Sequence, residues 1–195
     1  ESIDVTEERT ERPLRFPVQW VNRPNLDFRG FSGTVAAGAV KIGDEVLVAA
    51  SRKRAVIKQI VTMDGDLDRA VAGQAVTLVL DREIDISRGD VLAHPGATPE
   101  YSNQFQARLI WMNDEPAYPG RSYLLKIGAQ LVPATLTGLK YRTNVNTLER
   151  GAAKTLELNE VGTVTIATDK PIAFDPYADN GLTGGFILID RISNR

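Results

Sequence analysis

The 195-residue sequence has no cysteine and a single histidine, His94. The lack of cysteine excludes disulfide bonds and thiolate metal ligands, and it suits a reducing compartment, so we expect a cytoplasmic protein. The histidine stands beside Pro95 in a loop-like segment, without the partners that general-base catalysis or metal binding needs. No apolar run approaches the roughly 20 residues of a membrane helix. The sequence therefore argues against three classes at once: disulfide-rich domains, histidine-based active sites and helical membrane proteins.

An excess of one charge is also lacking. The chain carries 23 Lys and Arg against 25 Asp and Glu, a formal net charge of −2. Neither half is basic, and bulk electrostatics therefore does not favour a nucleic-acid-binding protein.

Nucleotide-binding motifs are absent as well. Gly38 and Gly43 have the spacing of a phosphate-binding loop, but such a loop continues with Lys and Ser or Thr. Here Asp44 and Glu45 follow, and their carboxylates would repel phosphate. The sequence contains no Asn-Lys-x-Asp motif for base recognition either. We therefore expect no GTP or ATP site and no cofactor bound by this chain.

A calcium loop and a nucleophilic hydrolase are excluded in the same way. Asp64, Asp66 and Asp68 begin like an EF-hand loop, but Arg69 and Ala75 stand where that loop needs Gly and Glu. The serines have no histidine or acid at a suggestive spacing. The sequence thus predicts no catalytic residue and no metal ligand.

What the sequence does contain is a glycine-rich stretch, residues 28–48, around which the chain is organised. Gly30, Gly33, Gly38 and Gly43 separate short runs of β-branched residues, and we expect the glycines to mark tight turns. Valine and isoleucine suit a pleated, half-buried surface. Short strands punctuated by glycine predict a small antiparallel barrel.

Alternating patterns extend this prediction along the chain. In residues 14–21, Phe16, Val18 and Trp20 alternate with polar residues or proline, which predicts a strand with these three side chains in the core. Trp111 is expected in the core for the same reason. Residues 149–158 predict a short helix or an irregular segment. The further expected strands are residues 56–63, 76–80, 84–92, 105–112, 123–127, 129–136, 139–144, 161–168 and 186–192.

Roughly a dozen short strands with frequent turns predict an all-β fold, and two units of similar length suit two consecutive antiparallel β-barrels. Residues 94–99 contain two prolines and a glycine, and we place the domain boundary there. The expected organisation is a charged linker over residues 1–13, a barrel over 14–96 and a second barrel over 100–195. The start at Glu1, without Met, predicts a fragment of a longer chain.

Several motifs add a family resemblance to this reading. Four motifs resemble the barrel that follows the GTP-binding domain in the elongation factor Tu group of translation GTPases: residues 33–38, 40–46, 72–76 and 85–92. Residues 16–24, 64–67 and 84–89 resemble, more narrowly, the GTPase subunit of sulfate adenylyltransferase, the CysN type. In the second half the same resemblance rests on residues 144–149, 158–162, 175–177 and 185–191.

The resemblance implies a function for the parent protein. Its N-terminal domain would bind GTP with Mg²⁺ and hydrolyse it, and a small subunit would carry adenylyl transfer from ATP to sulfate. The products would be adenosine 5′-phosphosulfate and pyrophosphate, and GTP hydrolysis would drive the reaction. The two barrels, resembling domains II and III of translation factors, would couple the two subunits without catalysing a reaction themselves. The implied partners are the small subunit, the chain's own GTPase domain and, in some members, a fused adenylylsulfate kinase domain.

Three expectations remain open at this stage. Relative to the family pattern the sequence stops before a closing strand, which predicts a second barrel with an open edge. Two other functions compete with the sulfate-activation role: barrels that hold aminoacyl-tRNA, as in elongation factors, and a stand-alone binding module. The first of these predicts a basic groove, and the balanced charge argues against it.

The candidate partner contacts are two charged turns. Charged residues on the turns of a rigid barrel are common docking points. The basic turn holds Arg52, Lys53 and Arg54, and the acidic turn holds Asp64, Asp66 and Asp68. These six residues are the predicted interaction site.

Overall fold

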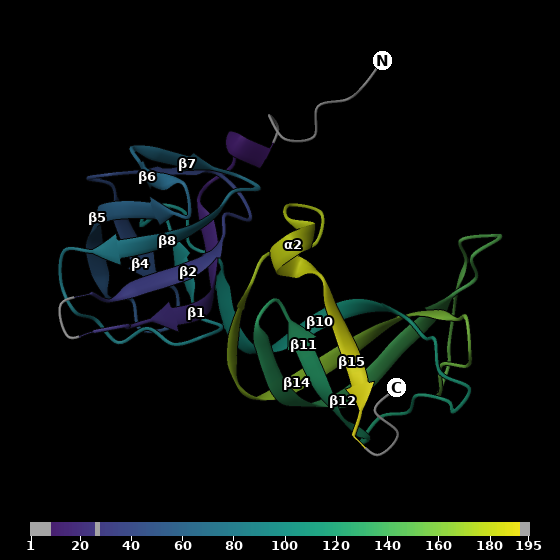
Figure 1. Cartoon of the computed structure of the whole chain (residues 1–195). Coiled ribbons are helices and arrows are strands. Elements are labelled where there is room, and N and C mark those ends of the chain that lie inside the picture. The colour runs from purple at the N-terminus through teal and green to yellow at the C-terminus, as the bar shows by residue number, and fades with distance from the viewer. Residues whose placement is uncertain (1–8, 26–27, 192–195) are drawn as a thin grey trace. The chain divides into compact units, whose positions relative to one another are not determined.

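The computed structural model describes residues 9–25 and 28–191 of the chain, which forms two compact units (Figure 1). The first unit comprises the described part of Glu1–Tyr101 together with Ile127–Gln130 and Ala173–Gly185. The second comprises Ser102–Lys126, Leu131–Ile172 and the described part of Phe186–Arg195. The path of the chain therefore returns twice to the first unit after residue 101.

The first unit is a closed β-barrel. Its main sheet has the order β4-β9-β1-β2-β8-β5-β6, and an additional pairing joins β4 to β5, which closes six of these strands into a ring. The pairings around the ring are antiparallel. β3 and β7 form a separate antiparallel pair. The strands are β1 (Arg15–Asn22), β2 (Gly30–Thr34), β3 (Ala39–Lys41), β4 (Glu45–Val48), β5 (Arg54–Thr62), β6 (Gly65–Leu67), β7 (Arg69–Val71), β8 (Ala75–Leu80) and β9 (Val91–Ala93).

The barrel interior follows the alternation of β1, but only up to a bulge. Phe16 and Val18 are completely buried, as predicted, whereas Trp20 is 62% exposed and the prediction for it was wrong. The register of β1 against β2 shifts between Val18 and Trp20, so that one extra residue lies in β1. Because an extra residue moves the following side chains to the opposite face, Trp20 points outward and Val21 packs against the core instead.

The glycines of the organising stretch have two different roles. Gly38 and Gly43 adopt positive φ angles of 75° and 89° and lie outside the strands, which fits the predicted turns. Gly30 and Gly33 instead lie within β2, where the predicted turns are absent. A Cβ on Gly33 would lie 2.4 Å from the carbonyl oxygen of Pro17 in the neighbouring strand. Glycine is required there because two backbones approach closely.

The second unit is a sheet in the order β10-β14-β12-β11-β15, with the two-residue strand β13 paired to β12. The segment predicted as two strands, 129–136 and 139–144, is one strand whose register against β14 shifts between Leu136 and Gly138 and again between Leu139 and Tyr141. Its buried side chains include Trp111, Leu125, Val132, Leu156, Val164 and Ile166. The strands are β10 (Glu100–Ile110), β11 (Ser122–Ile127), β12 (Gln130–Thr143), β13 (Arg150–Gly151), β14 (Val161–Phe174) and β15 (Phe186–Asp190).

Two local predictions are settled by the structure, and one short helix was not foreseen. Of the strand predicted over residues 84–92, only the end belongs to β9, because residues 84–90 form turns and irregular backbone. Residues 149–158 hold β13 and irregular backbone, so the second of the two predicted options applies. The four-residue helix α2 (Gly181–Gly184) was not predicted. Among the described residues, no helix is long and apolar enough to cross a membrane.

Candidate interaction sites

The predicted basic turn lies between β4 and β5 of the first unit. Arg52, Lys53 and Arg54 are all exposed, and Arg52 adopts a left-handed backbone conformation with φ 61°. Arg54 forms a surface ion pair with Glu45, with 3.2 Å between the guanidinium nitrogen and the carboxylate oxygen. Such exposed pairs contribute little to stability, which leaves the charges of this turn available to a partner.

The predicted acidic turn lies at the other end of β5. Asp64, Asp66 and Asp68 are exposed on and beside the β5–β6 hairpin, and Gln59 donates a 2.6 Å hydrogen bond to Asp66. From the first to the last of its nine residues β5 rises by about 3.3 Å at each step, so it separates the two turns by roughly 25 Å. The structure therefore does not join the six predicted residues into one site, and each turn is a separate candidate.

Neither turn has the geometry of a metal or catalytic centre. In residues 9–25 and 28–191, no group of three or more His, Asp or Glu side chains is arranged to hold a metal ion. His94, the histidine of the sequence, is exposed and its Nδ1 accepts a hydrogen bond from the amide of Gly96. That contact gives the ring a role in the local turn.

A polar cluster that sequence reasoning missed lies in the second unit around Arg121. Its guanidinium pairs with Glu115 at 2.8 Å and with Asp190 at 2.6 Å, and these hydrogen bonds raise the pKa of Arg121 above its ordinary value. The guanidinium carbon lies 5.8 Å from the ring centre of Tyr118 and 5.7 Å from that of Tyr123. The residues come from three separate stretches of sequence, and no local motif connects them.

Tyr123 is the most deeply buried residue of this cluster. Its side chain is 1% exposed, and its hydroxyl has no hydrogen-bond partner within the part of the chain that the structure describes. Burial raises the pKa of Tyr123 to about 12. A cavity of about 470 Å³ beside the cluster is lined by Glu115, Tyr118, Arg121, Ser122, Asp190 and Arg191.

A second feature that the sequence did not reveal is a buried ion pair in the first unit. Arg15 at the start of β1 contacts Asp175 through Nε at 2.8 Å and Nη2 at 2.9 Å, and both residues are 8% exposed. Thr183 donates a further hydrogen bond of 2.6 Å to the same carboxylate. This network fixes the returning segment Ala173–Gly185 within the first unit.

Comparisons with known proteins agree with the observed barrels. The family model described as "Elongation factor Tu domain 2" matches residues 31–93, and the model "GTP-eEF1A C-terminal domain-like" matches residues 104–195. Each match falls in one half of the chain.

Full-length relatives narrow the family further. The chain is 56% identical over 194 residues to the bifunctional enzyme NodQ of a Rhizobium species, strain N33. It is 45% identical to sulfate adenylyltransferase subunit 1 of Saccharophagus degradans and 47% identical to the bifunctional enzyme CysN/CysC of Rhodopirellula baltica. All three alignments cover 100% of this chain. The chain belongs to the CysN/NodQ family.

The CysN/NodQ relatives are considerably longer than this chain. It spans 30% of the NodQ and CysN/CysC proteins and 41% of the Saccharophagus subunit. Among solved structures, Sup35 in complex with GDP has a TM-score of 0.86 at 17% identity, covering 96% of this chain and 47% of Sup35. That likeness establishes the fold, two translation-factor-type β domains, as the sequence predicted.

Proposed function

We propose that this chain is the non-catalytic two-barrel region of the GTP-hydrolysing subunit of sulfate adenylyltransferase, also called ATP sulfurylase. The observation that carries the proposal is the similarity to CysN-type and NodQ proteins over the whole chain, at 45–56% identity. Identity at this level across both barrels is far more specific than the shared translation-factor fold. The same observation favours sulfate activation over the two alternatives, tRNA binding and a stand-alone module.

In this role the barrels couple GTP hydrolysis to the synthesis of adenosine 5′-phosphosulfate. A GTPase domain of the parent protein binds GTP and Mg²⁺, and the small subunit catalyses adenylyl transfer from ATP to sulfate. The barrels contact both and carry the nucleotide-dependent change from one to the other. In parents of the CysN/CysC type, an adenylylsulfate kinase domain is a further neighbour.

The closed barrel of the first unit suits this coupling role. A ring of paired strands has few ways to deform, so a displacement at one end moves the turns at the other end with it. The two charged turns lie at opposite ends of β5 and would therefore move as parts of one body. We propose the basic turn, Arg52, Lys53 and Arg54, as the contact with the small subunit, and the acidic turn as a second contact.

The test is calorimetric titration of the cognate small subunit into this chain at moderate salt. We expect saturable binding that the double variant Arg52→Glu/Lys53→Glu weakens by about tenfold, because charge reversal at a docking surface removes favourable pairing and adds repulsion. Arg88→Glu is the matched control, since Arg88 is an exposed arginine of the same unit in another turn. Absence of binding by the unchanged chain would contradict a role of the barrels in subunit assembly. An equal loss of affinity in the double variant and in Arg88→Glu would contradict the basic turn as the contact.

A further inference from the structure

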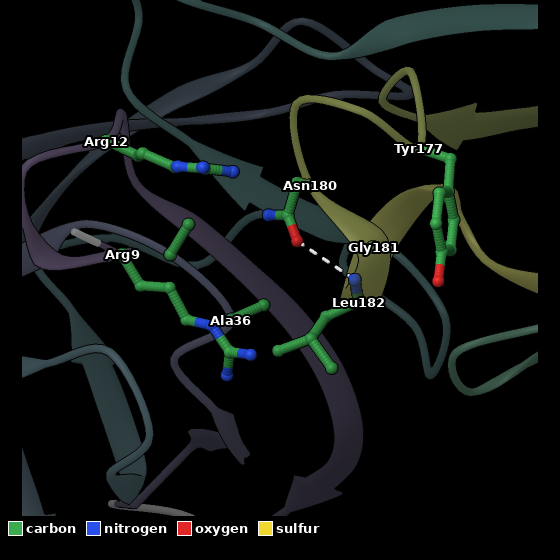
Figure 2. A pocket seen from close by; sticks show the side chains of 8 residues that line it. Arg9, Arg12, Ala36, Tyr177, Asn180, Gly181 and Leu182 are labelled. Atoms are coloured by element: carbon green, nitrogen blue, oxygen red, sulfur yellow. Dashed lines mark hydrogen bonds between the residues drawn. The ribbon is translucent and has the colours of Figure 1, made fainter. Parts of the chain in front are cut away.

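Two places in the chain gather cationic side chains and take no part in the roles described above. In the first unit, Arg9 and Arg12 of the N-terminal segment and Asn180 at the start of α2 line a cavity of about 360 Å³ (Figure 2). The side-chain oxygen of Asn180 accepts a 3.0 Å hydrogen bond from the amide of Leu182, which caps α2, and Arg12 is not a free cation. The other place is the outer face of the neighbouring strands β10, β14 and β12 in the second unit (Figure 1).

A bulge in β12 turns Tyr141 onto this outer face. The register of β12 against β14 shifts between Leu139 and Tyr141, so that Lys140 is an extra, exposed residue. Leu139 lies opposite the buried Val164, whereas Tyr141 lies opposite Thr163, whose neighbours in β14 on both sides are buried. Because a bulge moves the following side chains to the opposite face, Tyr141 and Thr163 both face outward.

Two arginines from neighbouring strands lie near Tyr141. The guanidinium carbon of Arg150 in β13 lies over the tyrosine ring, 4.7 Å from its centre. Arg108 of β10 is exposed and precedes the buried Leu109, so the alternation of the strand places it on the outer face as well. The hydrogen bond with Thr163 and, less strongly, the charges of Arg150, Arg108 and the lysine in the bulge lower the pKa of Tyr141.

The three cations around Tyr141 are not neutralised within the described part of the chain. Arg142, the next cation of β12, pairs with Glu160. Arg108, Lys140 and Arg150, by contrast, form no ion pair with any carboxylate of residues 9–25 and 28–191. Three positive charges thus remain together on one face of a chain whose net charge is −2. Such a face attracts acidic groups.

An apolar side chain on the same face indicates what kind of acidic partner fits. Ile110 stands two positions after Arg108 in β10 and is 67% exposed. Arginine, tyrosine and an aliphatic residue side by side are typical of protein–protein contacts. A nucleic-acid base would instead stack on an open aromatic ring, whereas Tyr141 is half-buried and carries the guanidinium of Arg150 on its ring.

We propose that this cationic face is a docking surface for an acidic segment of a partner protein, in which Asp or Glu side chains stand beside an aliphatic residue. The carboxylates pair with the guanidinium forks and the ammonium group, and the aliphatic side chain packs on the exposed isoleucine. This docking does not depend on the coupling role or on the charged turns of the first unit. The cationic face consists of Arg108, Ile110, Lys140, Tyr141 and Arg150.

The experiment titrates a synthetic peptide of the sequence EDIEDLED into the whole 195-residue chain at low salt. Two-dimensional ¹H–¹⁵N NMR follows the backbone amides and gives the affinity. We expect saturable shifts concentrated at residues 108–110, 140–143 and 150. The neutral counterpart QNIQNLQN should bind at least about tenfold more weakly, because it lacks the carboxylates that form charge-assisted hydrogen bonds. Added salt should weaken the binding of EDIEDLED, since exposed charges are screened.

Variants separate this face from the overall charge of the chain. Arg108→Gln/Arg150→Gln removes two cations of the face and should weaken peptide binding by about tenfold. Lys58→Gln/Arg88→Gln is the matched control, because it removes the same charge from exposed positions of the first unit and should leave the affinity unchanged. Ile110→Ala keeps every charge and should weaken binding roughly threefold through the lost apolar contact. Circular dichroism verifies that each variant is folded.

Three results would overturn the proposal: no saturable shift up to about 1 mM peptide, equal binding of the neutral peptide, or an equal loss of affinity in the double variant and its control. Tighter binding of an oligothymidylate than of the peptide, lost in the same double variant, would also overturn it and assign the face to single-stranded nucleic acid. The small subunit is absent from every titration. Failure here therefore leaves the coupling role intact, and failure of subunit binding leaves this docking surface intact.

Discussion

Both units of this chain are antiparallel β-sheets, but they differ in how completely the sheet closes on itself. In the first unit the pairing of β4 with β5 closes the sheet, and each strand of the ring has two neighbours. In the second unit the described strands form an open series that ends at β10 and β15. The first unit also contains more residues than the second, so the two units differ in size as well as in closure.

Burial along the strands reflects this difference. β5 of the closed barrel has nine residues, and Ala55, Ile57 and Ile60 are buried, with a register shift between Ile57 and Gln59. β10 of the second unit has 11 residues, and only Leu109 among them is buried. Phe105 of β10 and Phe186 of β15 pack edge to face, with 5.9 Å between ring centres, so the two end strands curl toward each other. We propose that a further strand completes this second barrel, in line with the family pattern.

Closure of a sheet determines which strand edges are available for pairing. A closed ring leaves no unpaired row of N–H and C=O groups, whereas end strands offer such rows to another segment or chain. Recognition by the ring strands of the first unit must therefore use side chains and turns. Recognition by the second unit can also use backbone pairing.

The largest expected effect comes from breaking the ion pair that fixes the returning segment to the closed unit. Asp175→Ala leaves the buried guanidinium of Arg15 without its carboxylate, and we expect a loss of about 3–5 kcal/mol in unfolding free energy. Urea denaturation followed by circular dichroism measures it. The control Asp179→Ala removes an exposed carboxylate from the same segment and should stay within about 0.5 kcal/mol. A loss below about 1 kcal/mol for Asp175→Ala would contradict the structural role of the pair.

An effect of intermediate size is expected in amide hydrogen exchange, which compares the strands of the closed sheet with the end strands of the open one. Backbone amides of β10 and β15 should exchange with solvent at least about tenfold faster than those of β5 and β8, because end strands open without disrupting a ring. Hydrogen exchange read by NMR or mass spectrometry tests this for each strand. Equal protection in all four strands would mean that the second unit is as completely closed as the first.

The smallest effect concerns Tyr123 in the second unit. Its pKa of about 12 in the folded chain exceeds the value of about 10 for an exposed tyrosine. The folded state therefore keeps this proton at a pH where the unfolded state loses it. The resulting stability is fully present below about pH 10 and is lost as the pH rises through about 12.

Tyr123→Phe should remove this alkaline loss of stability. At neutral pH we expect a change of less than about 1 kcal/mol, because the deleted hydroxyl has no partner among the described residues. Denaturation curves at a series of pH values between 9 and 12 compare the two proteins, on the scale given by the two pKa values. Tyr118→Phe is the matched control, since Tyr118 is half exposed. If the unfolding free energies of Tyr123→Phe and of the unchanged chain fell in parallel with pH, the alkaline loss of stability could not be assigned to Tyr123.

Local patterns predicted most of the strands and the barrel class, because alternation and glycine turns act over a few residues. The prediction failed at Trp20, where a bulge inverts the faces of β1 and where only the pairing with β2 reveals the extra residue. It also divided β12 at Gly138, since a glycine in a strand can mark either a turn or a bulge.

The functional features were less accessible than the fold. The charged turns are continuous in sequence and were identified as candidates, and their contact with a partner stays a prediction. The Arg121 cluster and the cavity beside Asn180 combine residues from distant segments. Their assembly depends on tertiary packing, which neither composition nor spacing encodes in a single sequence.

The ion pair of Arg15 with Asp175 spans 160 positions of sequence. A ribosome that adds roughly 5–20 residues per second needs about 10–30 s to travel from one partner to the other. During that interval the guanidinium of Arg15 lacks the carboxylate of Asp175, although most strands of the first barrel have already been synthesised. The first-synthesised barrel is thus among the last parts of this chain to reach its final form, and nascent chains halted before residue 175 should be the ones that chaperones and proteases detect.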